Sequence, residues 1–291
     1  MSNKSKNLTE ARIVKDDEFY TRMEDIESEI PFYSHHFRGK KIYLNCDDPK
    51  KSNFYKYFSE NFDKIGISEL HCTHLPTSDS QPHIYRKHTS KEDYEDIKIE
   101  SGDFRSEGCE GILSKCDIII SNPPFSLFRE YYAQIKKYRK KFLIIGSQNA
   151  HTYKEFFEDF AKNKVWMGVS KPKAFHRPNG SVQKFGNICY HTNLSHAERD
   201  EELMLTSEYS ENRYKKYENF DAIEVSKVSN IPKKYDGLMG VPISFLEKYC
   251  PNQFEIVGMD NELTKKTNGK SERFRIDGNT LYARIVIRHK R

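Results

Sequence analysis

The chain has 291 residues, of which 31% are charged and 36% are hydrophobic, and its formal net charge is +5. Aromatic residues make up 13%, enough to build a core, which argues against a disordered chain. The apolar runs are far shorter than the ~20 residues that span a membrane, and the polar N-terminus lacks the apolar centre of a signal peptide. Six cysteines at irregular spacings indicate reduced thiols, so we expect a cytoplasmic protein.

Charge is unevenly distributed along the chain. Residues 1–120 carry 18 basic and 23 acidic side chains, whereas residues 121–200 carry 14 basic and 6 acidic ones. Residues 201–291 add 16 basic and 14 acidic side chains. A basic middle and tail behind an acidic first part favour a surface for a polyanion, although ordinary surface lysines would give the same count.

Apolar strands alternate with amphipathic helices up to about residue 192. Strands are predicted at residues 41–46, 69–75, 97–99, 116–121, 141–146, 165–169 and 186–192. Helices are predicted at residues 126–138 and 154–163, and between the cap Ser52 and the stop signal Gly66. Residues 76–95 are polar and rich in histidine, and we expect an exposed excursion there. The alternation predicts an α/β fold with a doubly wound, mostly parallel sheet.

The pattern weakens after residue 194. Residues 195–219 are polar, and we expect a linker or a mobile loop. The remainder predicts strands at residues 238–241, 254–258 and 281–287 and a helix at residues 244–249. We therefore predict a larger domain at residues 1–194 and a smaller C-terminal region at residues 195–291.

The sharpest motif is Asn122-Pro123-Pro124-Phe125, directly after the apolar strand at residues 116–121. In open α/β sheets, ligands bind beyond the carboxyl ends of the strands. Two consecutive prolines stiffen the backbone, so the Asn122 amide oxygen and the Pro123 carbonyl become two acceptors in a fixed geometry. Two acceptors suit the two protons of an exocyclic amine, and Phe125 offers an aromatic face to a base. A plain strand-ending turn is the alternative.

This motif after an apolar strand is similar to the signature of amino-methyltransferases that use S-adenosylmethionine. Almost the whole chain resembles the EcoRI-type adenine-specific DNA modification methylases. The segments that carry the resemblance are residues 17–21, 45–49, 52–54, 121–130, 140–145, 184–188, 235–237 and 240–243. The resemblance implies a Rossmann-like methyltransferase that moves a methyl group from S-adenosylmethionine to the N6 amine of an adenine flipped out of double-stranded DNA.

The resemblance also implies a role for each matching residue. The catalytic residues are Asn122, Pro123, Pro124 and Phe125, and the cofactor-binding residues are Phe19, Tyr20, Thr21, Asn45, Cys46, Asp47, Asp48, Asp103 and Phe104. Two features depart from the common pattern, because a glycine-rich turn is absent and no acid ends the strand at Leu75 to bind the ribose. Asp47 or Asp48 could instead form an Asx turn that caps the helix, and Asp103 could be a solvent-facing turn residue.

The implied partner is double-stranded DNA. We expect the protein to bind it as a monomer, and we expect no association with a membrane. The candidate phosphate contacts are Lys171, Lys173, Arg177, Lys184, Arg288, Lys290 and Arg291. Base readout is expected from residues 195–291 and from the basic loop at residues 170–184. GAATTC, the target of the family's namesake, is the first sequence to test. Whether a cognate restriction endonuclease acts on the same site stays open.

Two other functions remain compatible with the motif: methylation of an RNA or of a protein amide, and DNA binding without catalysis. A zinc site is a further possibility to weigh, because histidines and cysteines recur at His71, Cys72, His74, His83, His88, Cys109 and Cys116. Their spacing fits none of the usual four-ligand patterns, so we predict no metal.

Overall fold

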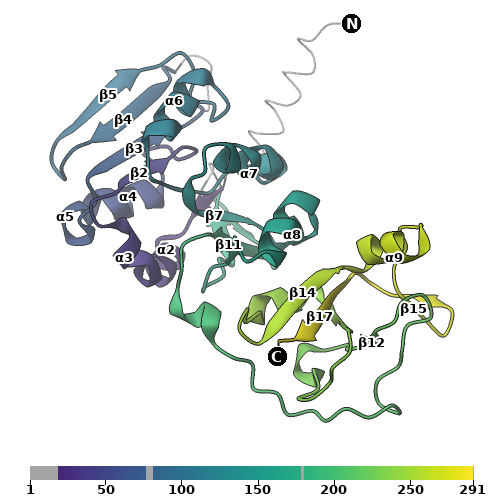
Figure 1. Ribbon diagram of the computed structural model, residues 1–291. Helices are drawn as coiled ribbons and strands as arrows, with labels where there is room; N and C mark the ends of the chain where they lie inside the picture. The colour runs from purple at the N-terminus through teal and green to yellow at the C-terminus, as the bar shows by residue number, and fades with distance from the viewer. Residues whose placement is uncertain (1–18, 77–80, 178–179, 291) are drawn as a thin grey trace, which may run out of the picture. The chain divides into compact units, whose positions relative to one another are not determined.

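The protein is described by a computed structural model that covers residues 19–76, 81–177 and 180–290. The described chain forms two compact units, shown in Figure 1. The first comprises the described residues of the ranges 1–156 and 165–196, and the second comprises those of the ranges 157–164 and 197–291. None of the described helices is both long and apolar enough to cross a membrane.

An eight-stranded sheet forms the centre of the first unit. In spatial order its strands are β5 (Tyr94–Lys98), β4 (Ile84–His88), β3 (Glu69–Thr73), β2 (Lys41–Leu44), β6 (Ile118–Ser121), β7 (Lys141–Ser147), β11 (Ile188–Thr192) and β8 (Trp166–Met167). From β2 the chain passes to β3 on one side and only later to β6 on the other. This change of direction is the switch point at which open α/β sheets bind ligands.

The α/β prediction is confirmed, but the sheet is mixed where we expected it to be mostly parallel. Strands β3, β2, β6 and β7 are parallel, as their apolar sequences predict. On the two sides, β4 and β5 extend β3 and the strands β11 and β8 extend β7, all in antiparallel pairing. Edge strands with a solvated face keep polar residues, so their sequences resemble loops.

The expected excursion at residues 76–95 is wrong for its second half. Residues 84–98 form the hairpin of β4 and β5, although β5 is exposed along its whole length. Arg86 on β4 donates two hydrogen bonds of 2.6 Å to Asp96 on β5 and lies 4.3 Å from the ring centre of Tyr94. Cross-strand pairs of this kind stabilise a hairpin that buries little apolar surface.

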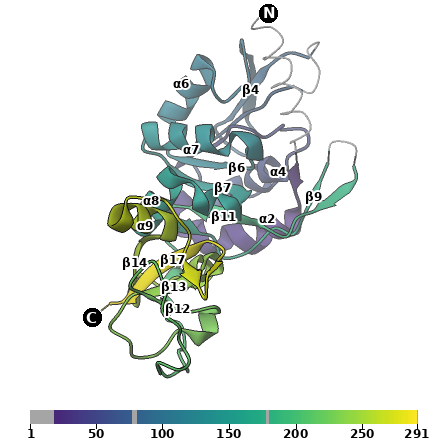
Figure 2. The same cartoon turned by 90° about the vertical axis from the view of Figure 1, so that its right-hand side faces the viewer.

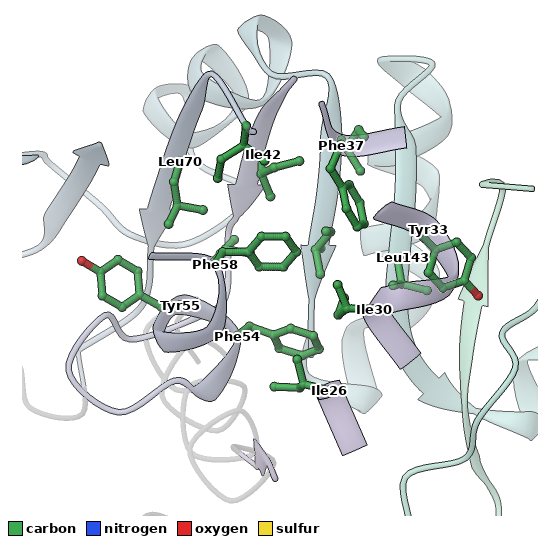
Figure 3. Close-up of a cluster of buried hydrophobic side chains, with 14 of the residues drawn as sticks. Ile26, Ile30, Tyr33, Phe37, Ile42, Phe54, Tyr55, Phe58, Leu70 and Leu143 are labelled. Atoms are coloured by element: carbon green, nitrogen blue, oxygen red, sulfur yellow. The ribbon is translucent and has the colours of Figure 1, made fainter. Parts of the chain in front are cut away.

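One face of the sheet is covered by α2 (Met23–Glu29), α3 (Ser34–Phe37), α4 (Asn53–Glu60) and α5 (Phe62–Ile65). Figure 3 shows buried side chains of α2, α3 and α4 beside Ile42, Leu70 and Leu143 of the sheet. The predicted start and stop signals are confirmed. The Ser52 hydroxyl accepts from the Tyr55 amide at the start of α4, and Gly66 ends α5 with a left-handed φ of 75°.

The opposite face carries α6 (Glu107–Lys115), α7 (Phe128–Lys137) and the start of α8 (Lys154–Ala161), and Figure 2 shows α7 and α4 on different sides of the sheet. Packing here is mainly aromatic. The rings of Phe128 and Tyr132 on α7 meet Phe156, at centroid distances of 5.7 and 4.8 Å. Phe128 also lies edge-on to His191 of β11. Helices on both faces make the sheet doubly wound.

A small second sheet lies in the first unit. It joins β1 (Tyr20–Thr21), β9 (Ala174–His176) and β10 (Val182–Lys184), with β9 in the middle and both pairings antiparallel. The basic loop expected at residues 170–184 is therefore a hairpin. The small sheet also brings Phe19 close to Phe175 and Phe185, which are far away in the sequence.

The second unit is built on a sheet of β12 (Ile223–Glu224), β13 (Met239–Pro242), β17 (Arg284–His289) and β14 (Phe254–Met259), in that order. Helix α9 (Asp260–Asn268) and the hairpin of β15 (Arg275–Ile276) and β16 (Asn279–Thr280) complete it. The strands at residues 238–241, 254–258 and 281–287 were predicted. The predicted helix at residues 244–249 is a 3₁₀ segment, Ile243–Lys248, and α9 was missed because its sequence is mostly polar.

Buried histidines make the stability of the first unit depend on pH. Burial lowers the pKa of His191 to about 4, and burial also lowers that of His71 to about 4. In the unfolded chain a histidine takes up a proton near pH 6.5. The folded state therefore favours the neutral rings, and the free energy of unfolding is expected to fall as pH drops from about 6.5 towards 4.

This expectation is tested by denaturant unfolding across that pH range. The His191→Gln variant keeps an amide nitrogen to donate to the Ser147 carbonyl, 3.3 Å from Nε2 of His191, but cannot be protonated. Its unfolding free energy should depend less steeply on pH than that of the wild type. Identical slopes for the two proteins would show that His191 is not held neutral by the fold.

Candidate active site

Asn122 lies directly after β6, and its two amide atoms have different environments. Its Nδ2 donates a hydrogen bond of 2.5 Å to the carbonyl oxygen of Phe19. Its Oδ1 is buried and has no hydrogen-bond partner within the described residues. Because a carbonyl can only accept, the Phe19 contact fixes which way the amide faces. The unused oxygen is thereby left as an oriented acceptor.

The prolines hold this amide in place. Pro123 is buried, whereas Pro124 and Phe125 are half-buried and lead into the 3₁₀ turn Phe125–Leu127 before α7. The Leu127 amide donates to the Pro124 carbonyl, which closes the turn. A buried acceptor without a donor costs about 1–3 kcal/mol. A plain strand-ending turn would not need this cost, so the arrangement favours a ligand that donates a hydrogen bond.

Four phenylalanines surround this end of β6. The ring of Phe19 stacks on that of Phe125 with centroids 5.9 Å apart and an interplanar angle of 19°. Phe185 meets both rings edge-on, at 5.0 and 5.9 Å, and Phe175 closes the cluster at 5.6 Å from Phe185. The guanidinium of Arg177 lies 5.9 Å from the ring centre of Phe19. An aromatic surface beside a free acceptor suits a base that carries an amine.

The turn after β2 is tied to β6 through Asp47. One carboxylate oxygen of Asp47 accepts from the Ser52 hydroxyl at 2.6 Å, and the other accepts from the Ser121 hydroxyl at 2.7 Å. Ser121 is the last residue of β6 and the neighbour of Asn122. A single buried carboxylate thus connects the start of α4 with the Asn122–Phe125 motif.

Asp48 follows a different pattern. Its Oδ1 accepts from the Lys50 amide at 2.9 Å, which is the Asx turn that the sequence left open, although Ser52 rather than Asp48 caps α4. Its Oδ2 lies 3.8 Å from Nε2 of His74 and 3.9 Å from Nζ of Lys51. Cys46, next to these acids, carries a free thiol. The acidic turn is therefore rigid and still has a carboxylate oxygen available at its edge.

Nine buried polar side-chain atoms have no hydrogen-bond partner within the described residues, and besides Asn122 Oδ1 two of them belong to predicted cofactor residues. They are Oγ1 of Thr21 and Nδ2 of Asn45. The Thr21 carbonyl accepts from Asn53 at 2.8 Å, and Oδ1 of Asn45 accepts from the hydroxyl of Tyr131. One hydroxyl and one amide NH₂ are thus held in place and left to donate to an anionic or polar group.

Asp103 and Phe104 join the same network from the segment before α6. Phe104 is buried and meets Tyr131 edge-on with ring centroids 5.1 Å apart. Burial raises the pKa of Asp103, but hydrogen bonds from the Arg105 side chain and amide outweigh it, and the net pKa is lowered. The carboxylate is therefore ionised, and both of its oxygens accept hydrogen bonds from Arg105. The preceding Gly102 has no room for a side chain, since an added Cβ would lie 1.9 Å from the His74 carbonyl.

These contacts bring most of the predicted site residues into one connected network, although the sequence scatters them between residues 19 and 125. Sequence reasoning did not assign roles to the residues that connect them, namely Ser121, Tyr131 and Phe175. Ser121 and Tyr131 are typical core positions in the sequence. Phe175 sits in a short hairpin whose strands are too brief to give a clear alternating pattern.

The predicted DNA contacts fall in both units. Lys173, Arg177 and Lys184 are exposed on or beside the β9–β10 hairpin, and Lys171 is half-buried. In the second unit Lys290 is exposed, and Arg288 donates 2.7 Å to Glu255. Arg291 lies outside the described residues.

Within the described residues, the histidines and cysteines weighed as zinc ligands form no group of three potential ligands. His71 instead lies 2.6 Å from the Tyr85 hydroxyl and 3.0 Å from a carboxylate oxygen of Glu69. A different buried trio within the described residues, His151, Cys189 and His191, has its potential ligand atoms within 4.8 Å of one another. No local pattern predicts this trio, because residue 151 is brought to β11 only by the tertiary fold.

The chain is similar to known proteins along nearly its whole length. The model of the family described as adenine-specific methyltransferase EcoRI matches residues 7–290. The chain is 39% identical over 323 aligned residues to the type II methyltransferase M.EcoRI of Escherichia coli, covering 99% of this chain and 97% of that protein. It is 31% identical to M.MgeORF184P of Mycoplasma genitalium, with 97% of this chain and 98% of that protein covered, and 31% identical to M.MpnI of Mycoplasma pneumoniae, with 96% and 97% covered. No solved structure matches.

The family model covers nearly the whole chain, and so do all three relatives. The match includes the Asn122–Phe125 motif, the acidic turn after β2 and the second unit, which are the parts described above. It favours methylation of adenine over that of a protein amide, and enzymatic activity over DNA binding alone. The protein therefore belongs to the family of EcoRI-type adenine-specific DNA methyltransferases.

Proposed function

We propose that this protein transfers the methyl group of S-adenosylmethionine to the N6 amine of an adenine flipped out of double-stranded DNA. The observation that carries the proposal is the buried, unused Oδ1 of Asn122 at the end of β6 beside Phe125. The family membership supplies the base, adenine, and the reaction type. The target amine then has a defined place in the protein.

Asn122 Oδ1 and the Pro123 carbonyl accept the two protons of the adenine amine. Holding both protons fixes the amine and directs its lone pair away from the acceptors. Flipping the base costs a few kcal/mol. Stacking on an aromatic ring offsets about 1–3 kcal/mol of this cost, and Phe125 with Phe185 supplies the rings. The Phe19 ring, which now stacks on Phe125, has to shift for the base to enter.

The residues around β2 and β1 fit S-adenosylmethionine. The unpaired donors of Thr21 and Asn45 match its carboxylate, and Asp48 can accept from its ammonium group. Asp103, which is ionised, can accept from the amine of its adenine, next to Phe104. Phe19, Tyr20, Cys46 and Asp47 complete the walls. When bound, the cofactor supplies an electrophilic methyl carbon. The protein therefore needs to position the cofactor and the amine and to exclude water, and it does not need to form a covalent bond itself.

DNA binding is assigned to the basic residues of both units. We propose that Lys171, Lys173, Arg177 and Lys184 contact phosphates beside the target base, since they lie on or next to the β9–β10 hairpin that contributes to the aromatic cluster. Residues 1–194 then form the catalytic domain and residues 195–291 the target-recognition region. The boundary of the two compact units near residue 196 supports this division.

The first test concerns chemistry. We expect Asn122→Ala to lower methyl transfer to adenine by on the order of 10²-fold or more, because one of two oriented acceptors is lost. Binding of S-adenosylmethionine should stay nearly unchanged, because Asn122 contacts the amine and not the donor. Methyl transfer is measured with DNA, RNA and protein acceptors side by side, and the wild type should modify only DNA. Near-normal turnover by the variant would remove Asn122 from this role.

The second test concerns the cofactor. S-adenosylmethionine should raise the melting temperature of the wild type in proportion to the logarithm of its concentration above the Kd. In Thr21→Val the unpaired hydroxyl is replaced by a methyl group, so the shift should shrink without loss of stability in the free protein. Asp103→Ala should also weaken binding.

Thr192→Val is the matched control, since Thr192 is a buried threonine whose hydroxyl donates 2.6 Å to the Phe142 carbonyl. It should lower the melting temperature of the free protein and leave the shift produced by S-adenosylmethionine intact. If the wild type shows no shift at saturating cofactor, the assignment of S-adenosylmethionine is wrong. If Thr21→Val shows a full shift, only the role of Thr21 is wrong.

A further inference from the structure

The second unit contains a cavity of about 1000 Å³ at one end of its sheet. Its charged lining consists of Lys233, Lys234, Arg288 and Lys290, against Asp236 and Glu255. The cations come from two segments, the loop before β13 and the end of β17. Cavities that take small molecules are lined mainly by apolar side chains, and this one is not. Its chemistry favours an extended anion.

The four cations differ in how far they are neutralised. Arg288 donates 2.7 Å to Glu255, its partner in the register of β14 and β17. Lys233 lies 3.4 Å from Glu208, an exposed pair of the kind that contributes little. No acid of the described chain lies within 4.0 Å of the ammonium groups of Lys234 and Lys290. Like charges that face one cavity repel each other, and an anion between them removes this cost.

The walls of the cavity are held by hydrogen bonds. The ring of His289 lies 2.8 Å from the Pro232 carbonyl, and the Lys233 amide donates 2.8 Å to the Ser207 carbonyl. The Tyr214 hydroxyl donates 2.7 Å to the Asn230 carbonyl, and the Lys290 amide donates 2.9 Å to the Gln253 carbonyl. The backbone that carries the lysines is therefore fixed before a ligand arrives, which lowers the entropy lost on binding.

Two tyrosines add a flat surface to the same cavity. The rings of Tyr209 and Tyr235 lie 4.6 Å apart with an interplanar angle of 36°. Gly237 makes room for Tyr235, because a Cβ there would lie 2.6 Å from its hydroxyl oxygen. Phenol hydroxyls donate to phosphate and sugar oxygens, and they are common among the groups that contact the DNA backbone.

From these observations we infer that the cavity is a clamp for the sugar-phosphate backbone of duplex DNA. The inference rests on the proposed function, which makes DNA the substrate, and it adds Lys233, Lys234, Tyr209 and Tyr235 to the expected contacts of Arg288 and Lys290. A backbone clamp orients the duplex for base readout elsewhere and carries no sequence information itself.

The test is the salt dependence of DNA binding by the full-length chain. Two labelled duplexes are used, one with the target sequence and one with the same composition scrambled. In the double variant Lys233→Gln/Lys234→Gln, the slope of log K against log salt concentration should fall by about 0.9 per lost contact. The affinity for both duplexes should fall alike, on the order of tenfold at low salt. The melting shift produced by S-adenosylmethionine should not change.

Lys265→Gln/Lys266→Gln is the matched control, since it removes two neighbouring exposed lysines from the last turn of α9, outside the cavity. It should leave the salt slope near the wild-type value. An unchanged slope in the cavity variant, or an equal loss in the control, would overturn the clamp. So would displacement of DNA by inorganic phosphate beyond its effect on ionic strength, because the cavity would then be a site for free phosphate. If the wild type does not methylate DNA at all, the proposed function fails instead.

Discussion

The carboxylate of Asp47 is the contact on which the whole site depends. It accepts from Ser52 at the start of α4 and from Ser121 at the end of β6, so it fixes two elements on either side of the switch point of the sheet. Hydrogen bonds to a buried charged group contribute about 1.5–3 kcal/mol each. They hold the strand ends in register, and the Asn122 amide and the acidic turn take their positions from those ends.

The site around Asp47 contains buried polar atoms that have no hydrogen-bond partner within the described residues. Thr21 Oγ1, Asn45 Nδ2 and Asn122 Oδ1 are buried without partners in the described part of the chain. Each costs stability in the free protein, and native structures contain few such atoms. In the proposed function they gain partners when S-adenosylmethionine and the target base bind, so the cost of orienting them would be met during folding rather than during catalysis. The rigid Pro123-Pro124 turn and the hydrogen bond to Phe19 serve the same end.

The sequence alone predicted the structure correctly where a single segment contained the pattern for its own element. Ser52 and Gly66 marked the ends of the helical segment, the apolar run before Asn122 marked β6, and the motif itself marked the acceptor. The sequence alone did not predict elements that form only through pairing between segments. The β4–β5 hairpin is too exposed to show an apolar pattern, and the β9–β10 hairpin is too short. The β9–β10 hairpin also pairs with β1, which is far away in the sequence, so Phe175, which completes the aromatic cluster, could not be found from local pattern alone.

The central claim is that the unused oxygen of Asn122 receives the amine of an adenine in DNA. The most direct measurement is single-molecule sequencing that detects modified bases in DNA from cells producing the wild-type protein and from cells producing the Asn122→Ala variant, whose DNA should stay largely unmodified. The account predicts N6-methyladenine at one position of one short sequence, with GAATTC as the first candidate, and no modified cytosine. Absence of N6-methyladenine while the folded protein accumulates, or methylation of another base, would contradict it.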